Sequence, residues 1–114
     1  MKEKHINDCY EYALNRLEEL SAQYDEQVNN IEDFALWNLP TELSDDWCNM
    51  KYFINILYDN EKIDDNIKSI LVQINDNFEK CTNGEHFTHK GMKYSKFWAQ
   101  QRQLAKQALR LMSK

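Results

Sequence analysis

Glycine and proline are scarce in this sequence, which contains two glycines and one proline in 114 residues. Turns with positive φ favour glycine, and proline marks turns and strand ends, whereas helix interiors disfavour both residues. One domain of this length can bury a hydrophobic core. Apolar residues make up 42% of the chain, which argues against disorder. The sequence therefore predicts a single all-α domain over residues 1–114.

The spacing of apolar residues predicts where the helices lie. In the first segment they recur at intervals of three and four, which place them on one helical face. This stripe consists of Ile6, Tyr10, Ala13, Leu17, Leu20 and Tyr24. The four main helices are predicted over residues 3–27, 44–60, 64–81 and 95–112. A short helix is expected between Asn30 and Pro40, giving a bundle of four main helices plus one short helix.

Polar residues at the starts of these segments support the boundaries. Ser44 and Ser95 are predicted N-caps, because a serine hydroxyl accepts hydrogen bonds from the first backbone N–H groups of a helix. Asp64 and Asp65 place carboxylates at the start of the third main helix, where the helix dipole favours them. Tyr58 is expected on the core-facing side of the second main helix.

Residues 82–93 contain both glycines and have no helical period, so they are predicted to form the principal loop. His86 and His89 lie there, five and eight residues after Cys81. Imidazole and thiolate are good zinc ligands, but a fourth ligand is missing locally. A solvated loop with two ordinary histidines is the alternative, and no metal or other cofactor is predicted.

The sequence gives no support for catalysis. Cys9, Cys48 and Cys81 lie at or near apolar helical stripes, where a buried thiol behaves as a small hydrophobic group. They are odd in number and far apart, which indicates reduced thiols in a cytoplasmic protein rather than a disulfide framework. No carboxylate stands alone in an apolar stretch that would raise its pKa. We therefore predict that the protein is not an enzyme.

Charge is divided unevenly along the chain. Residues 1–66 carry 16 acidic and 5 basic side chains, a net charge of −11, whereas residues 82–114 carry 7 basic and 1 acidic side chain, a net charge of +6. The whole chain has a net charge of −5. An acidic chain is a poor general ligand for nucleic acid and a reasonable partner for a basic protein.

Two charged surfaces are candidate binding sites. The acidic one, with Trp47 as a possible anchor, comprises Glu42, Asp45, Asp46, Trp47, Asp59, Glu61, Asp64 and Asp65. The basic one comprises Lys93, Lys96, Arg102, Lys106 and Arg110, of which the last three recur every four residues. Dipole compensation and pairing within the fold are the alternative explanations of these charges. Functionally, the acidic residues would dock a basic protein, and the basic residues would contact phosphate or an acidic partner.

The acidic stretch from Leu43-Ser44-Asp45-Asp46-Trp47 to Asp64-Asp65 and the closing segment Phe97–Ala105 carry a resemblance. In architecture and charge, the chain resembles the small acidic α-helical immunity proteins that bacteria pair with secreted or contact-delivered nuclease toxins. The resemblance covers most of the chain and includes no short motif. It implies a non-enzymatic cytoplasmic protein that blocks the active site or substrate groove of a basic toxin, with carboxylates in place of nucleic-acid phosphates.

These observations leave two hypotheses for function. The first is an immunity protein, monomeric or in a heterodimer with its toxin, with no signal peptide and no membrane span. The second is a small nucleic-acid-binding or phage-type regulatory protein that uses the basic last helix.

Overall fold

The computed structural model describes residues 3–29, 39–45, 47, 50–81 and 84–112. Every regular element within these residues is a helix, so the fold is all-α, as predicted. The elements are α1 (Glu3–Ser21), α2 (Tyr24–Asn29), α3 (Leu39–Asp45), α4 (Met50–Asp59), α5 (Asp65–Lys80), the 3-10 helix η2 (Gly84–Phe87), α6 (His89–Tyr94) and α7 (Lys96–Met112). None of the helices in this part of the chain has the length and apolar character needed to cross a membrane.

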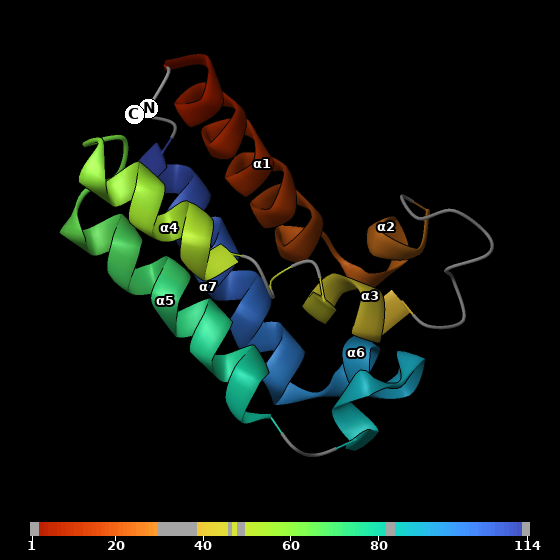
Figure 1. Ribbon diagram of the computed structural model, residues 1–114. Helices are drawn as coiled ribbons and strands as arrows, with labels where there is room; N and C mark the ends of the chain where they lie inside the picture. The colour runs from red at the N-terminus through yellow and green to blue at the C-terminus, as the bar shows by residue number, and fades with distance from the viewer. Residues whose placement is uncertain (1–2, 30–38, 46, 48–49, 82–83, 113–114) are drawn as a thin grey trace.

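Helices α1, α4, α5 and α7 form the body of the molecule, and α2, α3 and α6 gather at one end of it (Figure 1). Both α7 and α4 pack against α1 and α5, so each of the four helices has two neighbours in the bundle. The largest fully buried side chains are Trp47, Trp98, Leu17, Leu20, Met50, Ile54, Leu57, Leu71, Ile74, Met92 and Gln101. Burial of each large apolar side chain contributes about 2 kcal/mol to folding.

The predicted helix over residues 3–27 is divided into α1 and α2. Ala22 and Gln23 separate them, and Gln27 of α2 is buried. The Gln27 Nε2 group donates hydrogen bonds to the backbone oxygens of Glu19 (3.1 Å) and Leu20 (3.2 Å). These carbonyls belong to the last turn of α1 and have no partner within a helix that ends there. A side chain supplied by the next helix therefore ends α1 where the apolar period alone predicted its continuation.

The region around Pro40 also differs from the prediction. The predicted short helix lies in residues 30–38, which are outside the described residues. Pro40 lies in the first turn of α3, a position where proline is tolerated because its missing N–H would have no helical partner. Ser44 is inside α3 and is therefore not an N-cap. Turn hydrogen bonds from Trp47 N to Ser44 O (3.0 Å) and from Met50 N to Trp47 O (3.1 Å) lead into α4, which begins at Met50 rather than at residue 44.

The segment predicted as the principal loop, residues 82–93, instead contains η2 and all of α6 except its last residue, Tyr94. Thr88 caps α6 by accepting a hydrogen bond from the Gly91 N–H at 3.0 Å. Each helix is too short for an apolar period to show in the sequence. Ser95 caps α7, as predicted, by accepting a hydrogen bond from Trp98 N at 3.3 Å.

Candidate partner-binding groove

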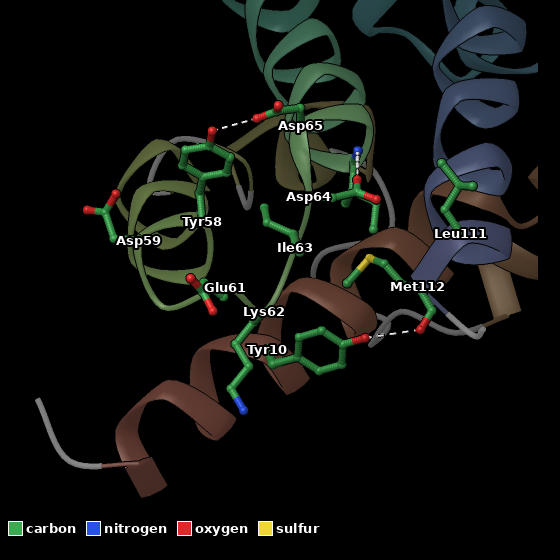
Figure 2. A pocket seen from close by; sticks show the side chains of 11 residues that line it. Tyr10, Tyr58, Asp59, Glu61, Lys62, Ile63, Asp64, Asp65, Leu111 and Met112 are labelled. Atoms are coloured by element: carbon green, nitrogen blue, oxygen red, sulfur yellow. Dashed lines mark hydrogen bonds between the residues drawn. The ribbon is translucent and has the colours of Figure 1, made fainter.

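A groove lies at the end of the bundle where the loop between α4 and α5 approaches α1 and the last turn of α7 (Figure 2). Its volume is about 770 Å³, within the range of sites that hold a ligand. The residues that line it are Tyr10, Tyr58, Asp59, Glu61, Lys62, Ile63, Asp64, Asp65, Ile67, Leu111 and Met112. The structure thus brings together four of the eight residues predicted to bind a partner: Asp59, Glu61, Asp64 and Asp65.

The backbone of the loop fixes the positions of these carboxylates. Glu61 has a φ of 60°, in the left-handed region that favours glycine. Its N–H donates to Tyr58 O at 3.1 Å, and the Lys62 N–H donates to Leu57 O at 2.8 Å. This pair of bonds forms a Schellman motif, which satisfies the last carbonyls of α4. Ile63 is buried after the turn, so the chain enters α5 with its apolar side anchored in the core.

Asp64 and Asp65 have different local contacts. Asp64 is the N-cap of α5 and accepts a hydrogen bond from Ile67 N at 2.9 Å through Oδ1. Asp65 Oδ1 accepts a hydrogen bond from the Tyr58 hydroxyl at 2.5 Å (Figure 2). This hydrogen bond, reinforced by the charge of Asp65, raises the pKa of Tyr58. Both carboxylates remain exposed, so neither is enclosed by its contact.

The groove carries negative charge that the described residues do not neutralise. Within the described part of the chain, Asp59, Glu61 and Asp64 form no ion pair. Among the described residues, Lys62 is the only basic one that lines the groove, and its Nζ lies 3.9 Å from Glu3 Oε1 in a largely exposed ion pair. Surface ion pairs of this kind contribute less than about 1 kcal/mol. The carboxylates are therefore available to a basic group from outside.

Two tyrosines complete the groove, and sequence reasoning assigned both to the core. The Tyr10 hydroxyl donates to Met112 O at 3.2 Å and so joins α1 to the last turn of α7. Tyr58 lies on α4 but its hydroxyl reaches the first turn of α5. Both side chains are half-buried, with the ring against the core and the hydroxyl at the surface. The apolar period predicts that the two rings pack against the core, but no signal in the sequence shows that the two tyrosines line the same groove.

Asp45 and Trp47, two of the remaining candidates, do not line the groove. Asp45 is exposed at the end of α3, before α4 begins. Asp46 and the side chain of Glu42 are outside the described part of the structure. Trp47 is 2% exposed and packs against Phe78 with ring centroids 6.3 Å apart. Its assignment as a binding anchor is therefore corrected: the indole fills the core between the α3–α4 connection and α5.

Arg102 is also misplaced by the sequence prediction of a basic surface stripe. It is 7% exposed, and its Nη2 group donates to Gln27 Oε1 and Met92 O, each at 2.9 Å. Both acceptors are neutral, and burial lowers the pKa of the guanidinium. The helical period placed Arg102 beside Lys106, but α2 and α6 cover this part of α7. Arg102 is a buried connection between these helices and is not part of a surface stripe.

The other basic candidates are exposed in two places. Lys93 and Lys96 lie around the junction of α6 and α7, whereas Lys106 and Arg110 lie farther along α7. The Lys93 Nζ lies 5.5 Å from the centroid of the Tyr94 ring. Without Arg102, these residues do not form one continuous row.

His86 and His89, which the sequence left as candidate zinc ligands, both contact aromatic side chains. The His86 ring stacks on Phe97 with centroids 5.2 Å apart, and His89 Nδ1 is hydrogen-bonded to the Tyr24 hydroxyl. A search of the described residues finds no group of three histidine, cysteine, aspartate or glutamate residues that could hold a metal ion.

Cys9 is buried in the core. Burial, with a smaller effect of Asp8, raises the pKa of the Cys9 thiol, which disfavours the nucleophilic thiolate.

Comparison with known proteins adds no relative: no family model, no curated protein and no solved structure matches this chain.

Proposed function

We propose that this chain is a non-enzymatic protein-binding inhibitor of the immunity-protein kind, acting in the bacterial cytoplasm on a basic toxin with a nuclease domain. The observation that carries the proposal is the convergence of Asp59, Glu61, Asp64 and Asp65 on one groove. Three of these carboxylates have no ion-pair partner among the described residues, so a basic surface can bind them without breaking an ion pair between those residues. A nuclease presents such a surface, because its substrate groove must attract phosphate.

The test is association with a toxin encoded beside this protein, measured against salt concentration. Simultaneous Asp59→Asn, Asp64→Asn and Asp65→Asn substitutions remove three charges, and asparagine at residue 64 still caps α5. We expect the association rate at low salt to fall about tenfold, because rates of steered encounter depend on complementary charge. The inhibition of nuclease activity should weaken in parallel.

The matched control removes three exposed carboxylates elsewhere, through Asp25→Asn, Glu26→Gln and Asp45→Asn. The net charge changes equally in both variants, so only the position of the charges differs. Equal losses in the two variants would show that overall acidity rather than the groove drives binding. Binding that does not respond to salt would contradict electrostatic docking altogether.

Nucleic-acid binding is the second candidate function, favoured by one observation. Tyr94 is 72% exposed beside Lys93 at the junction of α6 and α7, and an exposed ring next to a cation can stack on a base. A mobility shift with single-stranded RNA or DNA at moderate salt tests it. A shift abolished by Tyr94→Ala would support this function, and the absence of any shift would remove it.

A further inference from the structure

Outside the groove, α1 and α4 carry an aromatic cluster formed by Tyr12, Phe53 and Tyr52. The Tyr12 and Phe53 ring centroids are 4.6 Å apart, and those of Phe53 and Tyr52 are 5.6 Å apart. Tyr12 and Phe53 are half-buried, whereas Tyr52 is 58% exposed. The cluster therefore holds Tyr52 against a packed neighbour and leaves much of its surface open to solvent. Exposed tyrosines of this kind are enriched at the centres of protein interfaces.

Other tyrosines of this protein already bind cations on their rings. Arg16 lies 4.9 Å from the centroid of Tyr12 and also pairs with Glu19, with Nε and Oε1 3.0 Å apart. Lys68 Nζ lies 4.0 Å from the centroid of Tyr58, whose hydroxyl donates to a carboxylate. In both places a cation, an aromatic ring and a carboxylate lie together. These contacts are attractive because the face of an aromatic ring carries partial negative charge.

Tyr52 has an exposed ring but no cation of its own among the described residues. No lysine or arginine within the described residues lies over its ring. Asp59 follows seven residues later on the same face of α4, about 10 Å along the axis. Asp59 also lines the groove, so this face of α4 carries both Tyr52 and one groove carboxylate.

We propose that Tyr52 stacks against an arginine side chain of the basic protein that docks in the groove, so that the binding surface extends along α4. This inference rests on the proposed function and adds the chemistry of one contact. The four carboxylates of the groove favour a partner with cationic side chains, and one of them, Asp59, lies on the same face of α4 as Tyr52. Arginine fits better than lysine, since its planar guanidinium can stack on the face of the ring.

Nuclear magnetic resonance of the whole protein tests the contact with tetra-arginine amide as the probe and tetra-lysine amide for comparison. We expect the aromatic signals of Tyr52 to shift with tetra-arginine, in step with the backbone amides of Asp64 and Asp65. Tyr94 is the matched control, because it is 72% exposed but lies at the α6–α7 junction beside Lys93. Equal shifts of Tyr52 and Tyr94 would overturn the proposed contact.

Affinity for the same peptide provides the second measurement. Tyr52→Leu should weaken tetra-arginine binding about fivefold, whereas Tyr52→Phe should retain it because the ring remains. Tyr94→Leu should have no effect, and the loss with tetra-lysine should be smaller. Circular dichroism melts of each variant identify any change that comes from unfolding.

The outcomes separate this inference from the function on which it rests. Shifts at Asp64 and Asp65 without a shift at Tyr52 would overturn the aromatic contact and leave the groove as the docking site. A shift at Tyr52 with none at the groove would support the aromatic contact and overturn the groove assignment. If neither region responds, both proposals fail.

Discussion

The two ends of the bundle differ in whether their charged side chains are exposed or buried. At the groove, Asp59, Glu61 and Asp64 lie at the surface, and no cation within the described residues pairs with them. At the other end, where α2, α3 and α6 gather, the guanidinium of Arg102 is buried, and its hydrogen bonds to described residues go to neutral oxygens. The carboxylates at the groove are exposed to solvent, whereas the guanidinium of Arg102 joins helices inside the structure. The formal charge of a residue therefore does not reveal its role without its burial.

Between the two ends, the loss of Arg102 should have a larger effect on stability than the loss of any one groove carboxylate. Arg102→Ala leaves a cavity and removes the donors to Gln27 and Met92, so we expect a loss of about 3 kcal/mol in the free energy of unfolding. Urea denaturation followed by circular dichroism measures it. Lys106→Ala, one turn away and exposed, is the control and should change stability by less than about 0.5 kcal/mol. Equal changes in the free energy of unfolding for the two variants would contradict the burial of Arg102 and support the surface stripe that the sequence predicted.

The same contrast explains what the sequence could predict. The boundaries of α5 and the capping of α7 by Ser95 depend on interactions within a few residues, and both were predicted correctly. The division of α1 from α2 depends on Gln27, whose side chain bonds to carbonyls seven and eight residues earlier. Trp47 and Arg102 were misassigned because their burial depends on helices that are distant in sequence. The acidic cluster was visible, but its arrangement around a groove with Tyr10 required the tertiary structure.

The groove end should be less sensitive to single substitutions, starting with the cap of α5. Asp64→Ala removes the acceptor for Ile67 N, and we expect a loss of about 1 kcal/mol in the free energy of unfolding. Asp64→Asn retains an acceptor and should cost only a few tenths of that, while it still removes the charge from the groove. Thermal unfolding of the two variants separates capping from charge. Equal destabilisation by both would contradict the role of Asp64 as a cap.

A substitution of Glu61 should raise the free energy of unfolding rather than lower it. Because its φ of 60° is unfavourable for a side chain with a Cβ atom, Glu61→Gly should stabilise the protein by about 0.5 kcal/mol, after the greater freedom of glycine in the unfolded state is included. The variant also lacks one groove carboxylate, so tighter folding should accompany slower association with a basic partner. Glu61→Gln is the control for charge alone and should not gain stability. A destabilised glycine variant would show that the Glu61 side chain contributes contacts that outweigh the backbone strain.

The smallest effect concerns the pH response of Tyr58. Its pKa is raised above 10.0, first by the hydrogen bond to Asp65 and then by the charge of that carboxylate. Since the folded state favours the neutral phenol, this contribution to stability is present below the unfolded pKa and is lost as the pH rises through the folded pKa. Ultraviolet difference titration should show one tyrosine that ionises at a higher pH than an ordinary phenol, and Asp65→Asn should return the pKa of Tyr58 toward the ordinary value. Asp59→Asn should change this pKa less, because Asp59 acts only through its charge. A larger change with Asp59→Asn than with Asp65→Asn would show that the hydrogen bond between α4 and α5 is not the main cause of the raised pKa.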